Sequence, residues 1–178
     1  MARRLAFYTF SILRAPYGDP AVQEFDDRTP DVFAEAERMP GFIDRARPEP
    51  DIPWASNFEK NWGDWGPFAV PRFYLDGTAP GNTRQAQTLS IWTDLEAVRA
   101  FAYRGPLHRA ALRDRKAWFA DQGQPTYCMW WIEADEQPVW RDAARRLEHL
   151  ADHGPTPVSF DFKRTFTADD RPTVASVA

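Results

Sequence analysis

Three histidines are the residues of this 178-residue chain whose type and spacing best suit chemistry. His108 follows a Gly-Pro pair at the start of a helical stretch, where a neutral imidazole can act as a base, an acid or a ligand near pH 7. His149 and His153 stand four residues apart on a predicted helix and share a face, which is the spacing of metal ligands. A metal needs a third ligand, for which Glu148, Asp152 and Asp161 are the possibilities. A hydrogen-bonded corner with the following "HGPTP" is therefore the favoured interpretation of this pair.

Aromatic residues form the second group of candidates. They make up 15% of the chain and include eight tryptophans, which indicates a pocket for an apolar or aromatic ligand. Packing in the core is the alternative for each of them. The candidates for substrate contact are Tyr8, Phe10, Trp62, Trp65, Tyr103 and Trp130, with Trp92 placed near His108.

Charge and composition exclude several classes of protein. The net charge of −4 and the scattered arginines do not resemble a nucleic-acid-binding surface. No glycine-rich phosphate loop or nucleophile elbow is present, and the single cysteine, Cys128, lies in an apolar stretch that keeps a thiol neutral. A single cysteine fits a reducing compartment, and no apolar stretch is long enough to span a membrane. We therefore expect a cytoplasmic protein without nucleic-acid or membrane partners.

The hydrophobic pattern predicts alternating strands and helices. The predicted strands are residues 5–14, 41–47, 87–93 and 126–134. A first helix is expected from an Asp19 cap, with either a kink or a division into two short helices at Pro30. A second is expected from Asp94, after a Thr93–Glu96 capping box. Gly105-Pro106 should break the second helix just before His108. This order predicts an α+β fold of the ferredoxin-like βαββαβ type, followed by a helix over 138–154 and a half-buried strand over 158–166.

The chain is predicted to form a single domain over residues 1–178 with one long insertion. Residues 48–86 are rich in both proline and aromatic residues, so we expect an ordered loop packed at the mouth of a pocket. Residues 167–178 are expected to be a disordered tail. The fourth strand is apolar on both faces, which predicts a homodimer through the sheet face that the helices leave open.

Three stretches carry a resemblance to known proteins: "ERMPGFIDR", "SIWTDLEAVRAF" with the following "HRAAL", and "LEHLADHGPTPVSFDFK". Together they resemble a bacterial domain-of-unknown-function family of the dimeric α/β-barrel superfamily, which includes the antibiotic-biosynthesis monooxygenases. The resemblance implies a dimeric α/β barrel with a pocket between each sheet and its helices. Relatives place a tryptophan and a histidine in that pocket, and Trp92 and His108 match them. Thr9 and Ser11 stand where several relatives carry an asparagine.

The function implied is an enzyme of secondary metabolism that oxygenates or cyclises a bulky aromatic or polyketide-like molecule without a nucleotide cofactor. His108 would move the proton, while Trp92 and the aromatic residues of the insertion would hold the ring. One alternative is a haem-binding or haem-dependent enzyme with His108 as the axial ligand. Another is a non-catalytic small-molecule-binding module.

Overall fold

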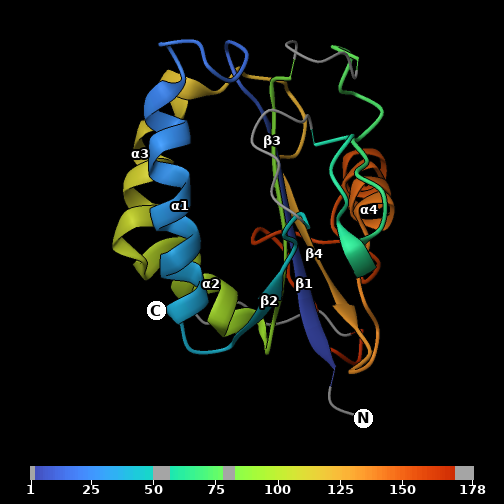
Figure 1. Cartoon of the computed structure of the whole chain (residues 1–178). Helices are drawn as coiled ribbons and strands as arrows, with labels where there is room; N and C mark the ends of the chain where they lie inside the picture. The colour runs from blue at the N-terminus through green and yellow to red at the C-terminus, as the bar shows by residue number, and fades with distance from the viewer. Residues whose placement is uncertain (1–2, 50–56, 78–82, 171–178) are drawn as a thin grey trace.

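The computed structural model describes residues 3–49, 57–77 and 83–170 (Figure 1). At its centre is a four-stranded sheet in the order β2-β3-β1-β4, with every neighbouring pair antiparallel. The strands are β1 (Arg4–Ile12), β2 (Phe42–Arg45), β3 (Gln85–Trp92) and β4 (Tyr127–Ile132). The predicted α+β class and the four predicted strands are therefore confirmed, with shifted ends.

Alternation along β1 divides the sheet into two faces. Leu5 lies opposite Trp92 and Trp131, and these side chains point to one face. Tyr8 lies opposite Leu89 and points to the other face. Each residue on the central strands therefore belongs to one of two separate layers.

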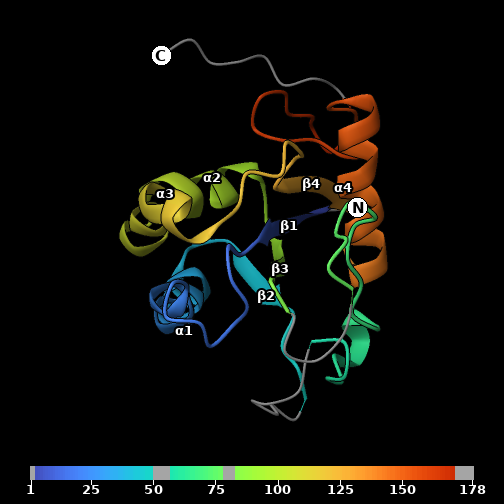
Figure 2. The same cartoon turned by 90° about the horizontal axis from the view of Figure 1, so that it is seen from above.

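Three helices cover one face, which we call the helix side: α1 (Gln23–Arg38), α2 (Leu95–Arg104) and α3 (Pro106–Trp118) (Figure 2). Phe101 of α2 packs with Leu5, Trp92 and Met129 in the core of this side. The α1 helix packs against α3 and β2 rather than over the middle of the sheet.

The other face, which we call the α4 side, is covered by α4 (Trp140–His153) and residues 57–77 (Figure 2). This 57–77 segment contains a short 3-10 helix, η1 (Gly63–Trp65), and packs Trp62 and Phe68 against Trp140 at ring distances of 5.0 and 4.9 Å. These residues of the predicted insertion are packed against α4, but as part of the core rather than at the mouth of a pocket beside His108. Residues 50–56 and 78–82 lie outside the described part.

The packing on the α4 side contradicts the observation from which the homodimer was predicted, namely a sheet face left open within one chain. Cys128, Trp130 and Ile132 of β4 are at most 1% exposed, because α4 of the same chain covers them. The face that was predicted to be open is thus closed within one chain. That the chain forms a homodimer stays a prediction, which sedimentation equilibrium at micromolar concentration tests.

The predicted strand over 158–166 is wrong. The segment makes only isolated bridges, one of which joins Phe160 to Met129 at the outer edge of β4. Asp161 Oδ1 accepts the backbone N–H groups of Lys163 and Arg164 at 2.9 and 3.4 Å, which turns the chain back on itself. The turn, rather than a strand, buries the phenylalanines of this segment.

Two predicted features of the first helix need correction. Asp19 does not cap it: its carboxylate accepts the N–H of Ala21, and the helix begins at Gln23. Pro30 lies inside a single continuous helix, so the division into two short helices is wrong, while a kink stays a prediction. Pro30 is exposed, and the Thr29 hydroxyl donates to the Phe25 carbonyl at 2.8 Å in the turn that the proline interrupts.

The second helix starts where the sequence predicted, but with a different cap. Asp94 is the N-cap and accepts the Ala97 N–H at 2.9 Å, while the Thr93 hydroxyl donates to Asp94. The break at Gly105 is confirmed, since α3 starts anew at Pro106.

Residues 167–170 form a turn closed by the Asp170 N–H and the Thr167 carbonyl, and residues 171–178 lie outside the described part. Within the described ranges, no helix has both the length and the apolar character that crossing a membrane requires.

Candidate functional site

His108 sits in the first turn of α3, and a buried carboxylate on α1 holds that turn. Glu35, which is 7% exposed, accepts the N–H of Leu107 at 3.0 Å and the N–H of His108 at 2.9 Å. These N–H groups have no partner within their own helix, so a carboxylate is well placed there. Glu35 thereby fixes the backbone of His108 relative to α1.

Gly105 makes room for this arrangement. A Cβ at this position would lie 2.7 Å from Glu35 Oε2 and 2.7 Å from the Phe101 carbonyl oxygen. The glycine in the "GP" pair is thus required by the close approach of Glu35 to the start of α3.

The His108 ring is held by a backbone carbonyl and an aromatic ring. Nδ1 lies 3.1 Å from the Ala102 carbonyl oxygen, and the ring centroid is 4.4 Å from that of Phe101. A carbonyl oxygen only accepts hydrogen bonds, so Nδ1 carries the hydrogen in this contact. In the neutral ring, Nε2 then bears a lone pair that can accept a proton.

Burial lowers the pKa of His108, and this effect outweighs the Ala102 carbonyl and the Glu35 charge, which both raise it. The imidazole is therefore mainly neutral at pH 7, in the state that a general base requires.

Trp92 does not share a cavity with His108 as was predicted. Its indole is fully buried between Phe42 and Phe101, at ring distances of 5.2 and 5.3 Å, and its Nε1 donates to Ser90 Oγ at 2.9 Å. Phe101 thus fills the space between the two side chains. Trp92 supports the site through packing and does not contact His108 directly.

The helix side of the sheet changes from apolar to polar beyond Trp92. We call this polar part the floor and define it as Thr9 and Ser11 of β1 with Thr88 and Ser90 of β3. Leu5 and Phe7, earlier on β1, are 0% and 4% exposed, whereas Thr9 is only partly buried.

Partial exposure on a central strand means that the helices do not fully cover the floor, and solvent reaches it. Thr9 Oγ1 and Thr88 Oγ1 are 2.7 Å apart and share one hydrogen bond. Thr9 and Thr88 are thus partly exposed hydroxyl groups on the helix side, whereas Ser90 is buried, accepts from Trp92 Nε1 and donates to the Phe7 carbonyl.

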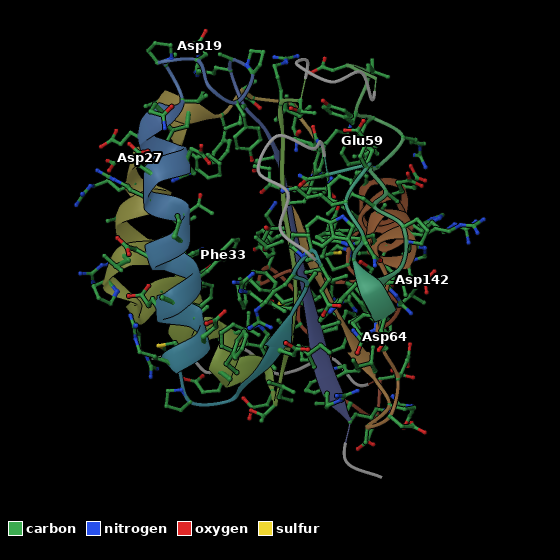
Figure 3. The ribbon with its side chains drawn as sticks, viewed as in Figure 1. Asp19, Asp27, Phe33, Glu59, Asp64 and Asp142 are labelled. Atoms are coloured by element: carbon green, nitrogen blue, oxygen red, sulfur yellow. The ribbon has the colours of Figure 1, made fainter. Side chains whose placement is uncertain are left out.

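The α1 helix contacts both the start of α3 and strand β2. Glu35 points to α3, while Phe33 and Glu37 on the opposite flank contact Arg45 of β2. Figure 3 shows Phe33 on the side of α1 that faces the sheet. His108 at the start of α3 and Arg45 on β2 are thus both held by α1, from opposite flanks of that helix.

Most of the predicted substrate-contacting residues lie on the α4 side, so the sheet separates them from His108. Tyr8, Phe10 and Trp130 are at most 1% exposed. Burial, together with the nearby Cys128 and Glu148, raises the pKa of Tyr8, whose hydroxyl donates to Gln87. These residues form core rather than a surface around His108.

Tyr103 is 55% exposed and packs against Phe162 at 5.3 Å. Trp62 and Trp65 border a hollow of about 220 Å³ next to β2. This hollow is also lined by Asp44, Arg45, Arg47, Glu49, Gly63, Asp64 and Gln137. A second hollow of about 460 Å³ is lined by Arg3, Glu133, Ala168, Asp169 and Asp170. His108 lines neither of them.

His149 and His153 form the predicted corner. Their rings are 4.5 Å apart, and His149 Nε2 lies 2.9 Å from Thr156 Oγ1 in the "HGPTP" turn. Arg72 contacts both neighbouring carboxylates, Glu148 and Asp152. Over the described residues, no group of three or more potential ligands is placed to hold a metal ion.

Cys128 is fully buried, and burial raises its pKa to about 12. The thiol is therefore neutral at physiological pH and has no nucleophilic role.

Two functional features escaped sequence reasoning. Glu35 gives no local signal, because its partners, Leu107 and His108, are more than 70 residues away and the contact depends on how α1 packs against α3. The floor left a partial signal: Thr9 and Ser11 are polar residues on a strand that must be buried in the centre of a sheet.

Comparison with known proteins adds a family but no activity. The sequence profile of a family described as a domain of unknown function, DUF3291, matches residues 4–176. No curated protein matches the chain. Among solved structures, a protein of unknown function from Nitrosomonas europaea is similar, with 12% sequence identity and a TM-score of 0.44, over 78% of this chain and 97% of that one.

Proposed function

The chain belongs to the DUF3291 family, and we propose that it is an enzyme acting on a small aromatic molecule, with His108 as the general base. The observation that carries the proposal is the His108 ring itself. Its Nδ1 is tied to the Ala102 carbonyl, and burial keeps it neutral, which leaves Nε2 able to take a proton. The hydroxyl groups of Thr9 and Thr88, on the helix side of the same sheet, would contact oxygen atoms of the substrate.

The proposed reaction begins with loss of a proton from an electron-rich ring to His108 Nε2. In the oxygenation, the resulting carbanion reacts with dioxygen, a ring methylene becomes a carbonyl, and the second oxygen atom leaves as water. In the cyclisation, the same carbanion attacks a carbonyl of its own molecule, and the alkoxide that forms is protonated. Both routes need a base and a shaped surface, and neither needs a nucleotide cofactor.

A haem with His108 as its axial ligand fits the surroundings less well. The carbonyl bond to Nδ1 is common for a ligating histidine. The imidazole, however, is packed against Phe101 at 4.4 Å. A haem macrocycle would need open space on every side of Nε2, far more than a single aromatic ring, so these surroundings favour the base over the axial ligand.

We also propose that the fold is ferredoxin-like and related to the dimeric α/β barrels. The support is the β2-β3-β1-β4 order with a helix after β1 and another after β3. The covered α4 side distinguishes this chain from a barrel that two copies would close through that face.

Oxygen uptake and product analysis with a panel of hydroxylated naphthalenes and anthracenones test the function. We expect turnover of at least one compound, and His108→Gln should lower it by roughly 10²-fold while the melting temperature stays close to that of the wild type. Arg109→Gln, an exposed neighbour on α3, is the matched control. Binding without turnover in the wild type would instead indicate a ligand-binding module. Equal turnover by His108→Gln would contradict the role of the base.

A further inference from the structure

Arg45 is the one cation of β2 that faces the helix side of the sheet. It lies opposite Ser90 in the β2–β3 register, and Ser90 belongs to the floor. Its guanidinium carbon lies 4.2 Å above the ring of Phe33, on the side of α1 that Figure 3 shows facing the sheet. With 19% of its side chain exposed, Arg45 is much more buried than a surface arginine.

The hydrogen bonds of Arg45 leave part of its guanidinium available. Nε donates to Glu37 Oε1 at 2.8 Å, and Nη1 donates to the Ala46 carbonyl at 3.3 Å. Nη2 has no acceptor among the described residues. Glu37 Oε1 also accepts from Arg47, so a single carboxylate oxygen serves two guanidinium groups.

Of the floor residues, Thr9 and Thr88 supply the donor that complements Arg45, because the Ser90 hydroxyl already donates to the Phe7 carbonyl. The bond between Thr9 and Thr88 uses one hydroxyl hydrogen and leaves the other free. Burial is also the main cause that lowers the pKa of Arg45, so its charge is incompletely hydrated and has more to gain from an anion. Donors without matching acceptors on a partly covered surface favour a ligand that brings oxygen acceptors.

We propose that Arg45 binds a carboxylate or phenolate group of the substrate and so orients its ring between the floor and His108. This inference rests on the proposed function, because it assigns the substrate class of the same site. Guanidinium and carboxylate match in shape and can form two parallel hydrogen bonds. The substrate class is then an anionic aromatic molecule rather than a neutral one.

Arg47 provides a matched control within the same cluster. It pairs with the same Glu37 and with Asp44, but 46% of its side chain is exposed. If binding depended only on positive charge near β2, substitution of either arginine would weaken it. If a substrate oxygen is bound by Arg45, only the substitution of Arg45 would weaken binding.

The test measures binding of two fluorescent probes, 1-hydroxy-2-naphthoate and its neutral methyl ester, by titration of the full-length protein. We expect the wild type to bind the acid more tightly than the ester. Arg45→Gln should weaken binding of the acid by about tenfold or more, as loss of a charge-assisted hydrogen bond does, and leave the ester within about twofold. Arg47→Gln should change neither.

Glu37→Gln gives a result that partial unfolding cannot imitate. It removes the carboxylate that competes for Arg45, so binding of the acid should become tighter. His108→Gln should bind both probes with affinities close to those of the wild type even though its turnover falls by roughly 10²-fold, which separates the anchor from the base. Acid binding by His108→Gln without turnover by any variant would support the anchor and contradict the proposed catalysis.

Three results would overturn the anchor: no binding of the acid to the wild type, equal weakening of the acid and the ester in Arg45→Gln, or equal weakening by Arg45→Gln and Arg47→Gln. In each case the guanidinium of Arg45 would serve only its ion pair with Glu37.

Discussion

Three contacts hold His108, and each of them fixes a property of the residue that can be measured. Glu35 fixes its backbone, the Ala102 carbonyl fixes its tautomer, and Phe101 covers its ring. The ring is neutral in the fold because protonation would place a charge in a partly apolar setting. Stability and protonation are therefore coupled at this residue.

The first expected outcome concerns stability against pH. The folded pKa of His108 is lower than the unfolded value of about 6.5, so the unfolded chain takes up the proton first as the pH falls. The contribution of His108 is complete above about pH 6.5 and is lost as the pH drops towards the folded pKa. Urea unfolding at pH 7.5 and pH 5 should show a smaller pH-dependent loss in His108→Gln than in the wild type. An identical loss in both proteins would show that the ring is not buried as described.

The second outcome concerns Glu35. Glu35→Ala removes the acceptor of two backbone N–H groups at the start of α3 and should lower the free energy of unfolding by about 1–2 kcal/mol. Urea denaturation measures the change. Glu24→Ala, an exposed residue at the start of α1, is the control and should change stability much less. Equal effects would contradict the capping role of Glu35.

At this scale the sequence identified His108 but misjudged its surroundings. The Gly-Pro break correctly placed it in a new first turn, because both residues act locally on the backbone. The intervening Phe101 could not be foreseen: it lies seven residues before His108 and on another helix, so its position depends on the angle between α2 and α3.

The elements of the α4 side are held together by aromatic packing rather than by regular hydrogen bonding. Trp62 stacks on Phe68 at 5.6 Å, and its Nε1 donates to the Asn57 carbonyl at 2.8 Å. In the 57–77 segment the only helix among the described residues is η1. Burial of its large side chains must therefore keep the segment in place.

The third outcome tests this packing. Trp62→Ala should lower the free energy of unfolding by about 3–5 kcal/mol, as truncation of a buried aromatic side chain does. Leu75→Ala, in the same segment but 87% exposed, should change it by less than about 0.5 kcal/mol. Equal values for the two variants in urea denaturation would mean that the segment does not stabilise the fold.

The sequence predicted the four strands and the helix break at Gly105 correctly. It predicted the helix caps and the segment after α4 less well. Apolar and aromatic runs locate β1, β3 and β4, since alternation is a local property of the chain. The segment after α4 has the same alternation but folds as turns, because Asp161 bonds to its own backbone. A prediction from hydrophobic periodicity does not detect a side chain that takes the place of a strand partner in hydrogen bonds to the backbone.

The molecule as a whole has two apolar cores separated by one sheet, and only one of them adjoins the candidate site. The prediction of a doubly covered fourth strand was correct in its physics, because both faces of β4 are buried. The prediction that a second subunit covers the other face of β4 was wrong. The C-terminal helix and the insertion supply that cover from the same chain, a long-range packing that strand patterns do not specify.

The fourth outcome tests this closure. Leu147→Asp places a charge at a fully buried position of α4 and should detach the helix from the sheet. We expect increased binding of a hydrophobic dye such as ANS and self-association in sedimentation velocity. Arg145→Asp, at an exposed position of the same helix, should behave like the wild type. Unchanged behaviour of Leu147→Asp would indicate that α4 is not needed to cover the sheet.

The most direct test of His108 as the base is nitrogen NMR of its imidazole. The three histidines of the chain can be assigned with His149→Gln and His153→Gln variants. We expect the His108 ring to carry its hydrogen on Nδ1, to titrate with a pKa below the ordinary value of about 6.5, and to shift its Nε2 resonance when 1-hydroxy-2-naphthoate is added. A hydrogen on Nε2, or a pKa at or above that value, would contradict its role as the base.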